Sequence, residues 1–172
     1  MKDQLDNFLT KGYARFNEPG LLNLSKFVMT NVEVQDKLVE DKDPEQQLEL
    51  KNFIDYITKN YVNPIWPNAE VTYYGVWDGV DEGSMTWHND AVEGFDFNVL
   101  YYYDSTDEDV GGAVEFRYNG GEDIIYPKAG DIVFINQNGK FYHKANRSEK
   151  QRRVATIEYK TNSNKENNER KT

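Results

Sequence analysis

The sequence contains no cysteine and only two histidines among its 172 residues. Without cysteine, the chain can form neither a disulfide framework nor a thiolate metal site. It also lacks an apolar signal-peptide region at its N-terminus and any hydrophobic run of membrane-spanning length. We therefore expect a soluble, cytoplasmic protein that has no membrane partner.

Basic residues are outnumbered, since 20 Lys and Arg face 30 Asp and Glu for a net charge of −10. A protein that binds nucleic acid through its phosphates normally presents a basic face, so nucleic acid is disfavoured as a partner. Aromatic residues, by contrast, are abundant: 12 Tyr, 9 Phe and 3 Trp. A chain of this length and composition can build one domain with a substantial core.

The first 70 residues favour helices. Apolar residues recur at helical spacing from Leu5 to Tyr13. A second helix is expected to begin at Asp43-Pro44, because Asp43 can cap it and proline suits the first helical position. Its apolar stripe consists of Leu50, Phe53, Ile54, Ile57 and Tyr61. Both helices are expected to support a sheet.

From residue 71 the sequence pattern changes to short runs of strand-forming residues that are separated by Gly, Asp and Asn. The expected strands are Val71–Trp77, Phe95–Tyr103, Ala113–Tyr118, Asp123–Tyr126, Ile132–Ile135 and Arg153–Tyr159. Regular short strands predict a mainly β core over residues 71–160, either a sandwich or a barrel-like jelly roll. With the N-terminal helices, this core makes one domain over 1–160, and the polar residues 161–172 predict a disordered tail.

The two histidines stand in a pattern that suits a metal. His88 and Asp90 form an H-x-D pair, and His143 follows 55 residues after His88. Two imidazoles and one carboxylate can occupy one face of an octahedral metal and leave positions open for a co-substrate and O₂. The same three groups could instead hold Zn²⁺ in a cupin-like metal or small-ligand binding protein without oxygenase activity. A third alternative is a structural interaction module in which both histidines are ordinary surface residues.

Residues alternate between the two faces of a strand, which gives the segment Phe95–Tyr103 an aromatic face and a mixed face. The aromatic face is expected to pack under the N-terminal helices. The mixed face carries Asp96, Asn98, Leu100 and Tyr102. In a jelly roll with a site at its mouth this face lines the pocket, where the Tyr102 hydroxyl could bind a carboxylate or keto acid.

The final strand offers two arginines on opposite faces. Arg153 shares a largely apolar face with Ala155, whereas Arg152 shares its face with Val154. A guanidinium on an apolar inward face needs an anion, because an unpaired buried charge is costly, and its fork suits a carboxylate. We therefore favour Arg153 over Arg152 as the anion-binding residue.

These residues together resemble the Fe(II)/2-oxoglutarate-dependent dioxygenases, in particular their prolyl 4-hydroxylase-like branch. The ordered motifs that carry the resemblance are His88-Asn89-Asp90, Leu100-Tyr101-Tyr102, Gly111-Gly112-Ala113-Val114-Glu115-Phe116, Pro127-Lys128-Ala129-Gly130-Asp131, His143 and Arg153-Val154-Ala155. They span roughly residues 71–160.

The resemblance implies a double-stranded β-helix fold and a hydroxylase that couples C–H oxidation to decarboxylation of 2-oxoglutarate to succinate. Its cofactors and co-substrates would be Fe(II), 2-oxoglutarate and O₂, with ascorbate as a further candidate. It implies that Fe(II) is bound by His88, Asp90 and His143. It also implies 2-oxoglutarate contacts from Arg153, Tyr102, Leu100 and Val114.

The prime substrate implied is a peptide, a protein or an amino acid. Met85 stands three residues before His88, where the animal prolyl hydroxylases often carry a tyrosine. The acidic segments 78–84 and 104–110 are expected to form loops beside the mouth of the site, and their charge favours a neutral or basic substrate.

Overall fold

The computed structural model describes residues 2–24, 44–79, 85–91, 94–150 and 152–161. Most of the predicted loop 78–84 and of the predicted tail lies outside these residues. Thr161 had been assigned to the tail, but it is the last residue of a strand. None of the helices in the described ranges is long and apolar enough to cross a membrane.

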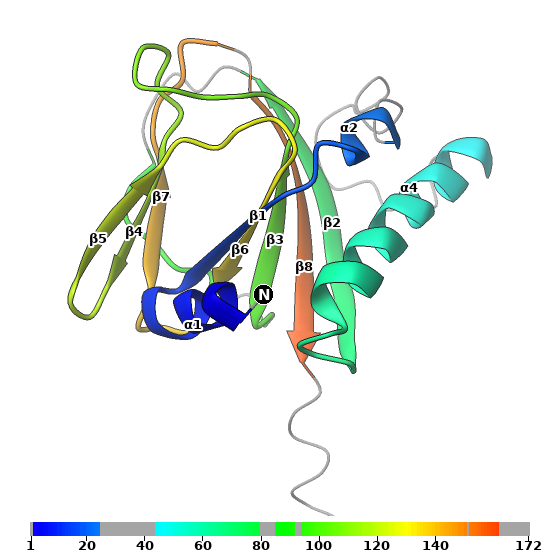
Figure 1. The fold of residues 1–172 in the computed structure, drawn as a ribbon, viewed down its shortest axis with the longest axis horizontal. Helices are drawn as coiled ribbons and strands as arrows, with labels where there is room; N and C mark the ends of the chain where they lie inside the picture. The colour runs from blue at the N-terminus through cyan, green and yellow to red at the C-terminus, as the bar shows by residue number, and fades with distance from the viewer. Residues whose placement is uncertain (1, 25–43, 80–84, 92–93, 151, 162–172) are drawn as a thin grey trace, which may run out of the picture.

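Eight strands in the described part of the chain form two antiparallel sheets that face each other (Figure 1). The larger sheet has the order β1 (Tyr13–Asn17), β6 (Asp131–Asn136), β3 (Phe97–Tyr102), β8 (Arg152–Thr161) and β2 (Ala69–Gly79). The smaller sheet has the order β5 (Gly121–Ile125), β4 (Val114–Tyr118) and β7 (Tyr142–Ala145). This is the mainly β, double-stranded β-helix core that was predicted.

The helices belong to the N-terminal part of the chain and lie beside the larger sheet (Figure 1). They are α1 (Lys2–Lys11), α2 (Leu21–Leu24) and α4 (Pro44–Ile57), which continues into a π-helical turn, Thr58–Val62. Proline occupies the first position of α4 as expected, since its fixed φ suits a helix start. In this helix the predicted stripe is confirmed at Phe53 and Ile57, which are both buried.

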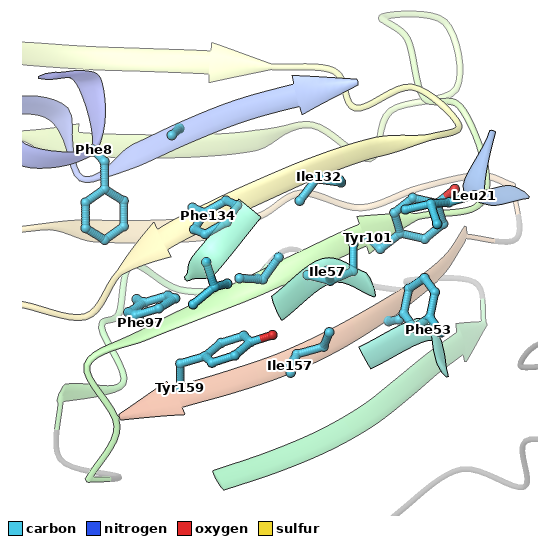
Figure 2. Packing of buried hydrophobic residues seen from close by; sticks show 14 of the residues in the cluster. Phe8, Leu21, Phe53, Ile57, Phe97, Tyr101, Ile132, Phe134, Ile157 and Tyr159 are labelled. Carbon is cyan, nitrogen blue, oxygen red and sulfur yellow. The ribbon is translucent and has the colours of Figure 1, made fainter. Parts of the chain in front are cut away.

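The main core lies between the helices and the outer face of the larger sheet. The rings of Phe53 on α4 and Tyr101 on β3 meet edge to face with centroids 5.4 Å apart (Figure 2). Phe97 stacks on Tyr159 of the neighbouring strand at 5.1 Å. The aromatic face of β3 therefore packs under the helices, as its alternation predicted.

A second core fills the space between the two sheets. It consists of Tyr102, Val114, Phe116, Ile125, Val133, Ile135 and Val154. On β6 the alternation is clear, since Ile132 and Phe134 belong to the main core while Val133 and Ile135 belong to this one. The residues between the sheets form the walls on which the candidate site is built.

The first 70 residues were expected to be helical, but they also contain the strand β1. Gly12 adopts a φ of +84°, which ends α1, and the chain then pairs with β6 from Tyr13↔Ile135 to Asn17↔Asp131. Tyr13 had been counted in the helical stripe. Its ring stacks instead on Phe116 of the smaller sheet, with centroids 4.2 Å apart. A tertiary contact thus overrides the local helical spacing.

Candidate metal centre

The fold brings together the three predicted metal ligands. One ligand atom from each of His88, Asp90 and His143 lies within 4.8 Å of the others. His143 is on β7, and the backbone of Met85 and His88 hydrogen-bonds to that strand. The backbone N–H of each histidine donates to the carbonyl of the other, at 3.1 and 2.9 Å. This bridge fixes the two imidazoles side by side, with ring centroids 4.3 Å apart.

The hydrogen bonding of His88 selects the tautomer that a metal needs. Its Nδ1 lies 2.8 Å from the carbonyl oxygen of Thr86. A carbonyl can only accept, so Nδ1 carries the proton and Nε2 keeps its lone pair. That Nε2 faces Asp90, whose Oδ1 lies 3.8 Å away. A metal-binding histidine commonly directs its other N–H to a backbone carbonyl in this way.

The carboxylate of Asp90 sits between the two imidazoles. His143 Nε2 is 3.8 Å from Asp90 Oδ2, the same separation that His88 Nε2 has from Oδ1. Two groups bound at about 2.1 Å to one ion lie about 3 to 4 Å apart. The spacing therefore fits a shared metal ion, and two histidines with one carboxylate on one side are the donor set of non-haem Fe(II) sites.

Burial keeps His143 neutral. Loss of hydration, with a smaller contribution from His88, lowers the pKa of His143 from its usual 6.5 to about 3. A metal binds the unprotonated imidazole, so this environment keeps the ligand available well below neutral pH.

This shift predicts that acid destabilises the metal-free protein. Below pH 6.5 the unfolded chain binds a proton at His143 and the folded chain does not, so stability is full above pH 6.5 and is lost as the pH falls toward 3. The slope is at most about 1.4 kcal/mol per pH unit. In urea denaturation at pH 7 and pH 5, we expect wild type to lose about 2 kcal/mol more than His143→Asn. Equal losses in the two proteins would contradict a neutral, buried His143.

A cavity of about 180 Å³ lies beside these ligands, between the two sheets. Both histidines line it, together with three residues that were predicted to contact a co-substrate: Leu100, Tyr102 and Val114. Asn98 and Thr156 add polar groups on the larger sheet. The mixed face of β3 therefore lines a pocket, as its alternation predicted.

The arginine in this pocket is Arg152, which corrects the orientation expected for Arg153. Arg152 is 6% exposed, lines the cavity, and donates from Nη1 to the carbonyl of Gly112 at 3.3 Å. Arg153 instead forms a two-pronged ion pair with Asp104, at 2.8 Å from Nε and 2.7 Å from Nη2. The anion that balances the Arg153 guanidinium is therefore Asp104 of the protein itself.

The pairing of β8 with β3 explains the correction. Tyr102 pairs with Val154 and Leu100 with Thr156, so the pocket residues of β3 share a face with the even-numbered residues of β8, and Arg152 extends that row. The apolar face that carries Ala155 packs into the main core under the helices. An apolar face was correctly recognised, but it faces the helices rather than the pocket.

The candidate metal ligands and Arg152 lie toward opposite ends of the pocket. Asn98 pairs with Ile135 near the end of β6, where Gln137 accepts a hydrogen bond from the backbone of Asp90 at 2.9 Å. Arg152 lies at the opposite end of β3, two residues before Val154, the partner of Tyr102. A small molecule with two separated acidic groups could therefore reach the metal with one group and the guanidinium with the other.

The sequence-based prediction did not single out three residues of this site. Thr156 lies on the same face of β8 as Arg152. It could have been predicted as a pocket residue if that face had been assigned to the pocket. Asn98 was placed on the pocket face but given no role, and its Oδ1 is buried without a hydrogen-bond partner among the described residues. Gln137 has no local signal, because its contact with Asp90 joins residues that are 47 positions apart.

No family model and no curated protein matches the sequence. Solved structures do match the fold. A prolyl-4-hydroxylase from Pseudomonas putida has 14% identity and a TM-score of 0.66, with 94% of each chain covered. A prolyl hydroxylase from Trichoplax adhaerens, in complex with a hypoxia inducible factor peptide fragment, has 14% identity and a TM-score of 0.61, over 92% of this chain and 87% of that one.

HygX from Streptomyces hygroscopicus, with nickel and 2-oxoglutarate bound, has 11% identity and a TM-score of 0.69, over 95% of this chain and 87% of that one. In each case the likeness covers more than nine-tenths of this chain. The chain therefore has the double-stranded β-helix fold of these prolyl hydroxylase and 2-oxoglutarate-binding structures.

Proposed function

We propose that this protein is an Fe(II)- and 2-oxoglutarate-dependent dioxygenase that hydroxylates a C–H bond. The observation that carries the proposal is the pairing of a His88–Asp90–His143 group with a buried Arg152 across one pocket. A metal site alone would fit many proteins. A cationic fork at the far end of the same cavity adds a place for a dicarboxylic co-substrate.

In the proposed site His88, Asp90 and His143 hold Fe(II). Bound there, Fe(II) supplies the activation of O₂, one atom of which enters succinate and the other the product. The overall reaction converts 2-oxoglutarate, O₂ and R–H into succinate, CO₂ and R–OH. Ascorbate is proposed as a reductant that keeps the iron ferrous.

The remaining pocket residues bind and orient 2-oxoglutarate. Arg152 pairs with its distal carboxylate, and the Tyr102 hydroxyl donates to the same co-substrate. Leu100 and Val114 pack against its carbon chain, because they provide the apolar walls between the two ends of the cavity. The similarity to a structure that holds nickel and 2-oxoglutarate supports this assignment.

For the prime substrate we propose a peptide, a protein or an amino acid. One of the similar structures holds a peptide fragment, which supports a peptide. The net charge of −10 favours a neutral or basic substrate over a nucleic acid. Met85 lines the pocket and is 52% exposed, so it lies where an entering substrate could contact it.

Anaerobic reconstitution tests the proposal. Metal-free protein is loaded with Fe(II) and 2-oxoglutarate, the visible spectrum is recorded, and succinate is measured after exposure to air. We expect a weak visible charge-transfer band and slow uncoupled succinate release, which candidate peptides or a host lysate should stimulate. Products in the lysate should gain 16 Da in mass spectrometry. Protein that binds Zn²⁺ but shows neither the band nor succinate would instead support the cupin-like binding protein.

A further inference from the structure

Backbone hydrogen bonds link the two histidines of the site to each other, but these bonds do not include Asp90. His88 and His143 exchange two backbone hydrogen bonds, whereas Asp90 lies two residues further along the chain. A carboxylate that must meet two fixed imidazoles needs an anchor of its own, because a shift of its backbone would carry it out of the ligand group.

That anchor is the side chain of Gln137. Its Oε1 accepts a hydrogen bond from the backbone N–H of Asp90 at 2.9 Å. Its own backbone N–H donates to the carbonyl of Asp96 at 3.0 Å. Gln137 therefore contacts both Asp90, which carries the proposed metal-binding carboxylate, and Asp96, which lies one residue before β3.

Gln137 is also well placed to be rigid. It follows directly after β6 and is only 2% exposed. It also begins the connection between β6 and β7, the strand that carries His143. Gln137 is therefore linked to Asp90 by a hydrogen bond and to His143 by a short stretch of chain. In a buried setting, the loss of its acceptor would leave the N–H of Asp90 poorly satisfied, which costs free energy.

We propose that Gln137 is a positioning residue of the metal centre, which sets the place of the Asp90 carboxylate relative to His88 and His143. This inference rests on the proposed function for the identity of the metal site. Groups that orient metal ligands commonly change metal affinity by about 10- to 100-fold when they are removed. Gln137 is thus expected to act on metal binding without touching the metal.

The side-chain amide of Gln137 contacts Asp90 through its oxygen, which accepts the hydrogen bond. Its Nε2 is buried and makes no hydrogen bond within the described residues. Gln137→Met keeps the length of the side chain and removes the acceptor. Gln137→Glu keeps the length of the side chain and an acceptor oxygen at the same place. The two variants therefore separate the hydrogen bond from the packing.

Titration of Co(II) into the metal-free full chain, followed by calorimetry, provides the test. We expect Gln137→Met to weaken Co(II) binding by about 10- to 100-fold. Gln137→Glu should stay within about threefold of wild type, and so should the neighbouring control Asn136→Ala. Asn136 makes a comparable contact outside the site, from its Nδ2 to the carbonyl of Phe8 at 3.3 Å. If Gln137→Met does not fold, Gln137→Asn, which is one methylene shorter, tests the same loss.

A second measurement follows the Asp90 amide itself. In the metal-free protein, its hydrogen exchange should be faster in Gln137→Met than in wild type and Gln137→Glu. Co(II) binding and Asp90 exchange that both equal wild type in Gln137→Met would overturn the proposal. If wild type itself binds no metal, the proposed function fails, while the exchange rates still decide whether Gln137 holds the backbone of Asp90.

Discussion

Replacing Asp90 with alanine is expected to reduce 2-oxoglutarate turnover by about a thousandfold or more, because the proposed Fe(II) site loses the one carboxylate that the described residues supply to it, and with it about 4 kcal/mol or more of transition-state stabilisation. The geometry supports so large an effect. Both carboxylate oxygens of Asp90 face an imidazole, each at 3.8 Å. The carboxylate thus lies between the two histidines, and no other acidic residue of the described chain joins this group.

The measurement combines succinate release with Fe(II) or Co(II) titration. Asp90→Ala and His88→Ala should both lose turnover and bind metal weakly while they melt close to wild type. Asp55→Asn is a suitable control, since Asp55 is an exposed carboxylate on α4 that pairs with Lys51 outside the site. An Asp90→Ala protein that turns over 2-oxoglutarate at the wild-type rate would remove Asp90 from the catalytic group.

The ligand group could be predicted from sequence because its signal is chemical and partly local. His88 and Asp90 are two residues apart, so one short segment presents both, and a chain with two histidines leaves only His143 to complete the set. Burial and tautomer could not be predicted in this way. The neutrality of His143 depends on the sheets that enclose it, and the orientation of His88 depends on the carbonyl of Thr86.

The fold class was likewise predictable from alternation, but two short strands were not. β1 begins at Tyr13, which had been counted in the helical spacing that starts at Leu5, and β7 has only four residues. β7 is held by its partners, since it pairs with β4 from Val114↔Ala145 to Arg117↔Tyr142. Strands of this kind are specified by the sheet that they join, and they therefore appear only once the tertiary structure is known.

The orientation of the two arginines was predicted wrongly for a different reason, because different criteria were used to choose the pocket face of β3 and that of β8. On β3 the face with mixed polar and apolar residues was assigned to the pocket. On β8 the largely apolar face was assigned to it. Neighbouring antiparallel strands place paired residues on the same face of the sheet, so one criterion has to serve both. Tyr102 on the mixed face of β3 pairs with Val154 of β8. The face of β8 that carries Val154 also carries Arg152, so the same criterion selects Arg152.

Arg152→Ala is accordingly expected to raise the 2-oxoglutarate concentration required for half-maximal turnover by about 30- to 1,000-fold. Removing one partner of a buried charge pair costs about 2 to 4 kcal/mol, and each 1.4 kcal/mol is tenfold in affinity. Arg152→Lys should recover only part of the loss, because an ammonium keeps the charge but not the two-pronged geometry.

Arg153→Ala is the matched control, one residue away on the other face of the same strand. Its ion pair with Asp104 is partly exposed, so its loss should cost about 1 kcal/mol of stability or less. The 2-oxoglutarate requirement should stay near that of wild type. The comparison is decisive in either direction: a large rise in Arg153→Ala with none in Arg152→Ala would reverse the assignment, and with it the face of β8 that binds the co-substrate.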